Sequence, residues 1–151
     1  MNLHGEKVVF NKCVFDLKDE YIWTYGAKQV EFNGCTFNTT GKAILIYKDG
    51  GLIDTNVSVK GCTFNATKGA TASAIANQNC ADIEIHNYQS NITLTTENNT
   101  VDSDFSGEWR IKQYDTTNNC TISVNGITYT QIAVDGKLMT IDGNKNVTVI
   151  E

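Results

Sequence analysis

Two short stretches of the chain place charged side chains at every second position, the spacing that puts them on one face of an extended strand. The side chains with this spacing are Asp82, Glu84, His86, Glu108, Arg110 and Lys112. On neighbouring strands, Glu84 and Glu108 could act as general acid and general base. Arg110 could neutralise the carboxylate of a uronic acid. These residues form the most chemically dense surface that the sequence predicts.

The same alternation is also typical of a solvated sheet face. Opposite charges on neighbouring exposed strands contribute only about a few tenths of a kcal/mol each. We therefore assign no catalytic residue and predict a ligand-binding role for six residues: Glu84, His86, Glu108, Arg110, Lys112 and Tyr47. An acid-base role for the two glutamates remains the alternative.

No residue spacing predicts a metal ion or a cofactor. CxxC and HxxH spacings are absent, and Asp102 with Asp104 supplies only two neighbouring carboxylates. The histidines are His4 and His86, which are too few and too far apart in the sequence to suggest a serine-type catalytic set. We expect neither a metal site nor a cofactor.

The element that must position these residues is indicated by a recurring eight-residue phrase. Clear copies are Val30–Phe37, Val57–Phe64 and Ile122–Tyr129, looser copies are Val8–Phe15 and Leu94–Val101, and Val147–Glu151 is a truncated copy. Repetition at this spacing predicts a solenoid whose units bury their apolar faces against their neighbours.

Each phrase reads as two strands separated by a tight corner. Val30 and Phe32 share one face before Asn33-Gly34, and Asn-Gly tolerates the positive φ that a corner requires. A further apolar stretch follows in each unit, so we predict three short strands per unit. The corner keeps its length, whereas the other connections vary, the longest running from Asn65 to Asp82. This pattern favours a chain that winds as a coil of parallel strands.

The strand, corner and strand, with asparagine at the corner, resemble the right-handed parallel β-helix of the pectate-lyase-like superfamily. The matching asparagines are Asn11, Asn33, Asn98 and Asn125, while the third coil has Lys60-Gly61 instead. The resemblance implies an all-β fold with three short parallel sheets. It implies about five full coils plus a partial one, forming a single domain over residues 1–151.

For activity the resemblance is unspecific, because the superfamily includes lyases, hydrolases, adhesins and phage tailspikes. In its polysaccharide-active members the substrate groove resembles the sheet predicted to carry Glu84 and Arg110. The Gly-His-Gly pattern of the galacturonase type does not occur in this chain.

Three cysteines occupy the same slot of the phrase. Cys13, Cys35 and Cys62 are expected to form an inward stack of free thiols, because free cysteine packs as a small apolar residue. A disulfide between neighbouring rungs is the alternative. Cys80 and Cys120 are expected in loops, where they could be exposed.

The aromatic residues divide into core and surface. Trp23 and Trp109 each follow the last core position of a phrase by the same number of residues, which predicts that both point inward. If the faces of that sheet are reversed, Trp23 and Tyr25 form an exposed sugar-stacking platform instead. Tyr47 is predicted to be external, because the isoleucines before it point inward.

Composition limits the partners. The 151 residues carry a formal net charge of -5, and Arg110 is the single arginine, which argues against a nucleic-acid surface. No stretch is long and apolar enough for membrane insertion, and the start lacks the regions of a signal peptide. Because the chain stops within a strand phrase, with nothing evident to cover the last coil, we expect a fragment of a longer secreted or cell-surface protein.

Three functions fit these features. The preferred one is a non-catalytic module of a bacterial surface or secreted protein, which binds a glycan or a host or cell-surface protein. The second is a fragment of a polysaccharide lyase or glycoside hydrolase. The third is a structural stalk with end-to-end self-association through its open ends.

Overall fold

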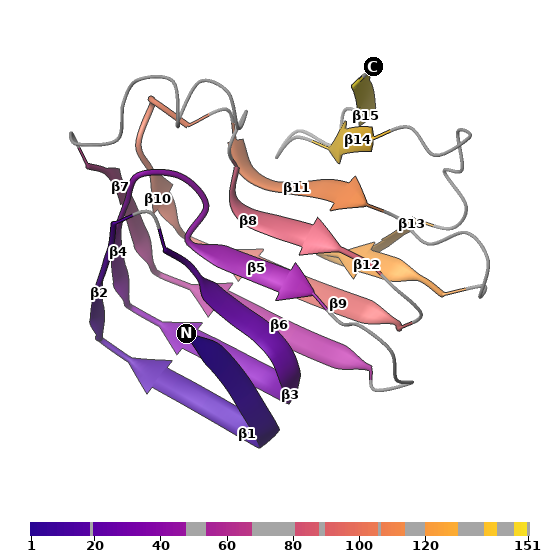
Figure 1. Ribbon diagram of the computed structural model, residues 1–151, viewed down its shortest axis with the longest axis horizontal. Helices are drawn as coiled ribbons and strands as arrows, with labels where there is room; N and C mark the ends of the chain where they lie inside the picture. The colour runs from indigo at the N-terminus through magenta and orange to yellow at the C-terminus, as the bar shows by residue number, and fades with distance from the viewer. Residues whose placement is uncertain are drawn as a thin grey trace.

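The computed structural model describes residues 1–18, 20–47, 54–67, 81–87, 90–105, 107–113, 120–129, 138–141 and 147–150. All regular structure in these residues is β-strand (Figure 1), so the predicted all-β class is confirmed. The strands are β1 (Asn2–Asn11), β2 (Val14–Leu17), β3 (Ile22–Asn33), β4 (Thr36–Thr39), β5 (Ile44–Tyr47), β6 (Thr55–Lys60), β7 (Thr63–Ala66), β8 (Ala81–His86), β9 (Ile92–Glu97), β10 (Thr100–Val101), β11 (Gly107–Gln113), β12 (Ile122–Val124), β13 (Ile127–Tyr129), β14 (Leu138–Ile141) and β15 (Val147–Ile150).

The largest sheet curls around the long strand β3 (Figure 1). The first half of β3 pairs in parallel with β5, and its second half pairs in parallel with β6. β1 also pairs in parallel with β3, over most of the length of β3. The strand order is β11-β8-β5-β3-β6-β9-β12-β13. A second parallel sheet has the order β10-β7-β4-β2, and each of its strands follows a strand of the curled sheet after a short corner.

The repeated phrases lie in register. Phe10 pairs with Phe32, Phe32 with Val59, and Val59 with Thr96, as the sequence alignment of the phrases predicts. The next rung differs, because Val124 pairs with Leu94 and not with Thr96. The slip is two residues, which leaves the same side chains on the inner face.

In the first four phrases the corner uses one left-handed residue. It is found at Lys12 (φ 52°), Gly34 (φ 60°), Gly61 (φ 61°) and Asn98 (φ 53°). Beside it, the Asn33 Nδ2 donates a hydrogen bond of 3.0 Å to the Asn11 Oδ1, so the predicted asparagine ladder exists between these coils. Asn98 occupies the glycine position of the corner, not the position of Asn33.

A second polar ladder runs along the other parallel sheet, and the sequence interpretation had not identified it. The Asn38 Nδ2 donates to the Asp16 Oδ1 at 2.6 Å, and the Asn65 Nδ2 donates to the Asn38 Oδ1 at 3.0 Å. These bonds connect three successive strands across residues that lie in register.

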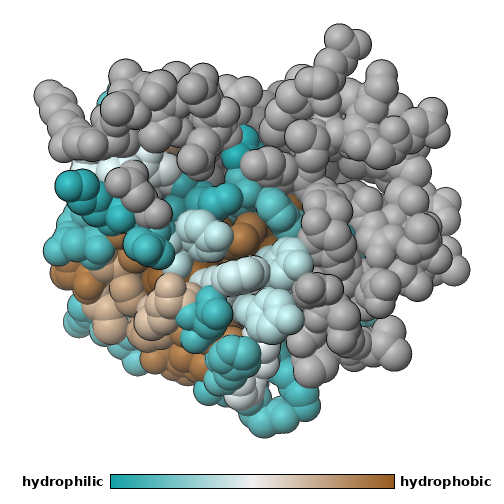
Figure 2. Space-filling view, in the orientation of Figure 1, coloured by the Kyte–Doolittle hydropathy of each residue, from teal (hydrophilic) through white to brown (hydrophobic). Residues whose placement is uncertain are grey.

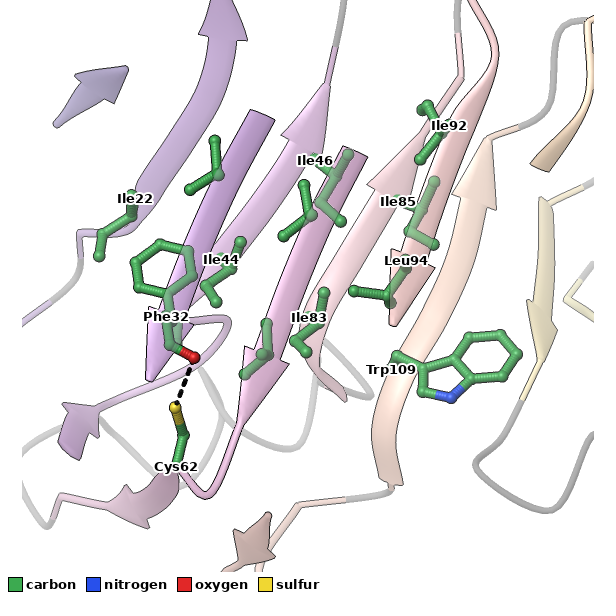
Figure 3. Packing of buried hydrophobic residues seen from close by; sticks show 14 of the residues in the cluster. Ile22, Phe32, Ile44, Ile46, Cys62, Ile83, Ile85, Ile92, Leu94 and Trp109 are labelled. Atoms are coloured by element: carbon green, nitrogen blue, oxygen red, sulfur yellow. Dashed lines mark hydrogen bonds between the residues drawn. The ribbon is translucent and has the colours of Figure 1, made fainter. Parts of the chain in front are cut away.

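The core is a stack of like side chains from successive strands. Phe15 stacks on Phe37 with ring centroids 5.1 Å apart, and Phe37 stacks on Phe64 at 4.8 Å. Figure 3 shows the isoleucines of β5 and β8 side by side in the same core. Burying each such side chain contributes about 1.5 to 3 kcal/mol.

The cysteine stack is inward, as predicted. Cys35 and Cys62 are buried and Cys13 is half-buried, all with free thiols. The Cys62 thiol donates to the Phe32 carbonyl oxygen at 3.5 Å (Figure 3). Burial raises the pKa of the Cys62 thiol, which favours the protonated form. Cys120 lies in a connection, as predicted, but it is buried and not exposed; Cys80 lies outside the described residues.

The C-terminal part departs from the predicted coil. β13 folds back antiparallel on β12, β15 is antiparallel to β14, and β14 lies beside β11. Strands are present at 127–129 and 147–150, but their predicted parallel pairing is wrong. The physical cause at β13 is the two-residue loop Asn125-Gly126, in which both residues have positive φ, the geometry of a tight hairpin.

Candidate functional site

The outer face of β3 carries two large aromatic residues. Ile22 and Thr24 are fully buried on the inner face, so Trp23 and Tyr25 point outward, where both are partly exposed. The predicted core position of Trp23 is therefore wrong, and the reversed assignment is the correct one. Trp109 is buried next to Ile83, with which it pairs in register, so its predicted core position is confirmed.

Trp23 and Tyr25 belong to an aromatic cluster that we define as Tyr21, Trp23, Tyr25 and Tyr47. Tyr47, on the outer face of β5 as predicted, stacks on Tyr25 with ring centroids 5.8 Å apart and planes inclined by 18°. The Trp23 ring lies 5.2 Å from that of Tyr47 and 5.4 Å from that of Tyr25. Tyr21 makes an edge contact with Trp23 at 6.3 Å. All four side chains are partly exposed.

A charged cluster, which we define as Lys42, Glu84, His86 and Arg110, is centred on the carboxylate of Glu84. Arg110 pairs in register with Glu84, and its Nε donates to the Glu84 Oε2 at 3.0 Å. An Arg110 terminal nitrogen contacts the same oxygen. The Lys42 Nζ donates to the Glu84 Oε1 at 3.0 Å, and the His86 Nε2 lies 2.6 Å from that oxygen.

The centre of this cluster is buried, which differs from the solvated sheet face that the sequence suggested as the alternative. Glu84 is 0% exposed and Arg110 is 4% exposed. Burial alone would raise the pKa of Glu84. The hydrogen bond with His86 and the positive charges of Arg110 and Lys42 outweigh burial and hold that pKa well below its ordinary value. Glu84 is therefore an ionised, internally compensated carboxylate.

The aromatic and charged clusters are contiguous. The Lys42 Nζ lies 4.9 Å from the centre of the Tyr21 ring, a cation–π distance. At the other end, the His86 and Tyr47 rings meet edge to face at 6.2 Å. Figure 2 shows this side of the molecule, where pale and brown side chains lie among teal hydrophilic ones. The outer face of β3, β5 and β8 thus combines ring surfaces with polar groups.

Glu108 lies in different surroundings. Its Oε2 accepts a hydrogen bond from the Thr96 Oγ1 at 2.9 Å, and its Oε1 accepts one from the Asn99 Nδ2 at 2.7 Å. Asn99 occupies the cysteine slot of the phrase, and its Oδ1 also accepts the Cys62 N–H at 2.8 Å. The bonds of Glu108 are therefore to Thr96 of β9 and to Asn99 in the corner after β9, not to Glu84 or its partners.

Asp82 is a second carboxyl group outside the charged cluster. It is fully buried, and neither of its oxygens has a hydrogen-bond partner among the described residues. Burial, with the nearby carboxylates of Glu108 and Asp102, raises the pKa of Asp82 to about 9. At neutral pH Asp82 is therefore a neutral acid.

The structure brings together three of the residues predicted for the ligand site. Glu84, His86 and Arg110 meet directly, and Tyr47 adjoins them through His86. Glu108 lies apart, and the side chain of Lys112 is outside the described part of the chain. Lys42 was missed, because it precedes its strand and alternation along β5 does not extend to it.

Neither a metal centre nor a membrane-spanning helix is found among the described residues. In the part of the chain that the structure describes, no three His, Cys, Asp or Glu side chains are grouped to hold a metal ion. The same residues contain no helix with the length and hydropathy needed to cross a membrane.

No protein-family model, curated protein or solved structure matches this chain.

Proposed function

We propose that the chain is a right-handed parallel β-helix of the pectate-lyase-like type that serves as a non-catalytic glycan-binding module. The in-register phrases, the single left-handed residue at each corner and the curled parallel sheet support this architecture. A secreted or cell-surface location belongs to the same proposal.

The aromatic cluster is the observation that carries the binding role. Tyr and Trp rings offer apolar surface at one end and a polar group at the other, which suits a ligand with both C–H faces and hydroxyl groups. The four rings contact one another, so their side-chain rotamers are mutually restricted before a ligand arrives. Such a preorganised surface loses less entropy on binding.

The charged cluster supports binding more than acid-base catalysis. Glu84 is held by Arg110, Lys42 and His86, which keeps its pKa too low for proton exchange near neutral pH. Glu108, the proposed second catalytic group, bonds to Thr96 and Asn99 instead. An adhesin-like or other binding role therefore fits these contacts better than a lyase or hydrolase.

A glycan-array screen of the whole chain tests this proposal. For a glycan that binds, isothermal titration calorimetry should show a dissociation constant at least about tenfold weaker for Trp23→Ala, because the central ring of the cluster is lost. Val14→Ala is the matched control, since it removes an exposed apolar side chain from β2, outside the cluster. Uniformly negative arrays, or equal weakening by both variants, would contradict the proposal.

A further inference from the structure

One end of the molecule consists of two strands that each have a single described neighbour. β1 pairs with β3 and β2 pairs with β4, and no other described strand pairs with either (Figure 1). Val9 is 40% exposed and Val14 is 66% exposed at this end. Behind them lie side chains that pack on the core but are only partly buried: Val8, Phe10, Cys13, Phe15 and Leu17.

An edge of this kind binds another strand unless something opposes it, because half of its N–H and C=O groups lack a strand partner. Charged side chains are the common means of opposing it. On β1 these charges are Glu6 and Lys7, which are 81% and 49% exposed. Glu6 and Lys7 are adjacent and carry opposite charges. They therefore disfavour alignments of a second strand that bring like charges together, and they favour an alignment that brings opposite charges together.

The order of residues in β1 is self-complementary. β1 runs from Asn2 to Asn11, so its midpoint falls between Glu6 and Lys7. When a second β1 lies antiparallel about that midpoint, Glu6 of each copy faces Lys7 of the other. A parallel alignment would instead set Glu6 against Glu6 and Lys7 against Lys7, and like charges in direct opposition are destabilising.

The faces of the two strands also agree in this alignment. Leu3, which is buried, falls opposite Phe10, which packs on the core. Gly5, in register with the buried Ala27, falls opposite Val8. Apolar inner positions thus meet apolar inner positions. This agreement depends on the bend in β1 at Gly5, which has a φ of 119°. The bend shifts the alternation of inner and outer side chains, so the inner positions are Leu3 and Gly5 in the first half and Val8 and Phe10 in the second.

We infer that β1 pairs antiparallel with β1 of a second copy of this chain, giving a closed two-fold dimer. Head-to-tail stacking is disfavoured, because at the other end β12 already pairs with the antiparallel β13 and β14 lies beside β11. An isologous contact uses the same surface of both copies and stops at two. This interaction surface is separate from the aromatic cluster and goes beyond the proposed function.

Sedimentation velocity of the full chain across the micromolar range tests the dimer. The expected result is a concentration-dependent shift from monomer to dimer. Glu6→Lys places four positive charges at the contact, two from each copy, and should weaken the dimer at least about tenfold. The double variant Glu6→Lys with Lys7→Glu restores opposite charges across the two-fold axis and should recover most of the dimer.

Glu6 and Lys7 each also form an ion pair within their own chain, so a control must break such a pair without changing β1. Lys28→Glu is this matched control. The Lys28 Nζ lies 2.6 Å from the Glu6 Oε1, so this variant breaks the same internal ion pair as Glu6→Lys but leaves the contact between copies intact. It should dimerise like the parent chain. A monomer at every concentration, an open-ended series of larger species, or failure of the double variant to recover the dimer would overturn the inference. Circular dichroism of each variant separates loss of association from loss of folding.

Discussion

The carboxylate of Glu84 has polar or charged partners on both of its oxygens. Arg110 binds one of its oxygens, and Lys42 and His86 bind the other. A charge at 0% exposure is stable only when it is paired and hydrogen-bonded in this way. The cluster therefore connects β11, β8 and the start of β5, and it makes the outer face of these strands sensitive to loss of any one charge.

Arg110→Met should destabilise the fold. The substitution leaves Glu84 buried with two of these partners, so we expect a cost of about 3 kcal/mol, at the low end of that for breaking a buried ion pair. Urea unfolding measures the loss. The double variant Glu84→Gln with Arg110→Met removes both charges and should cost clearly less than the sum of the single substitutions. Additive losses would show that the two side chains do not act as a pair.

The contribution of Asp82 to the free energy of unfolding depends on pH in the opposite direction to that of Glu84. The unfolded chain loses the Asp82 proton near pH 3.9, whereas the folded chain keeps it to about pH 9. Between these values the folded state binds more protons, so raising the pH favours unfolding. Glu84, whose pKa is lowered in the folded state, instead contributes stability above its unfolded pKa near 4.3 that is lost as pH falls.

Asp82→Asn isolates the first effect. The variant cannot ionise, so its free energy of unfolding should fall less than that of the parent chain between about pH 5 and pH 9. Chemical denaturation at a series of pH values measures the difference. Asp54→Asn is the control, because Asp54 is an exposed residue. Parallel pH profiles for the parent chain and Asp82→Asn would contradict the buried, neutral state of Asp82.

At the scale of elements, one dipeptide forms two different corners. In Asn33-Gly34 only the glycine has positive φ, and the chain continues into the next parallel sheet. In Asn125-Gly126 both residues have positive φ, and the chain reverses into a hairpin. Both asparagine side chains bond to the preceding strand, Asn33 to Asn11 and Asn125 to Thr96, so this bond does not distinguish the two corners. The dipeptide alone therefore does not decide between them.

Substitutions at Gly61 test the requirement for a left-handed corner. Nothing lies within 4 Å of a Cβ added there, so any loss comes from the backbone conformation. Gly61→Asn should cost less than about 1 kcal/mol, because asparagine tolerates this region and Asn98 already occupies the equivalent corner at φ 53°. Gly61→Val should cost about 2 kcal/mol, since a β-branched residue does not. Thermal unfolding compares the two, and equal losses would contradict this origin.

The two tryptophans show how far the sequence predicts the elements. Alternation within a strand is reliable, which is why the inner positions of β6 and β8 and the cysteine stack were predicted correctly. The inward orientation of Trp23 was predicted from its separation from Phe15, which lies on the other side of a connection. No rule preserves the alternation of side chains across a connection, and this prediction was wrong. The charged cluster was predicted only in part for the same reason, since Lys42 lies in a connection. Burial of Glu84 depends on the folded surroundings and has no signal in the strand pattern.

For the whole molecule, the stack is asymmetric from one end to the other. The first coils are lined by phenylalanine, isoleucine and cysteine, whereas Thr96, Asn99 and Glu108 form a hydrogen-bonded polar group in the later ones. The C-terminal end carries antiparallel strands, while β1 at the other end has one described strand neighbour. A strand with a described neighbour on one side only is held by fewer interstrand hydrogen bonds, so the two ends should open more readily than the middle.

Hydrogen exchange should show this gradient and its dependence on concentration. The amides of β6 are paired with β3 and β9 on its two sides and should exchange slowest. In dilute solution, the β1 amides that do not bond to β3 should exchange fastest among the strands of the curled sheet. If β1 pairs with a second copy, those amides should become protected at high protein concentration, whereas amides of β2 outside the two-fold contact should change less. Mass spectrometry of peptides from β1, β2 and β6 at two concentrations measures this, and fast exchange of β1 at both would rule out pairing through that edge.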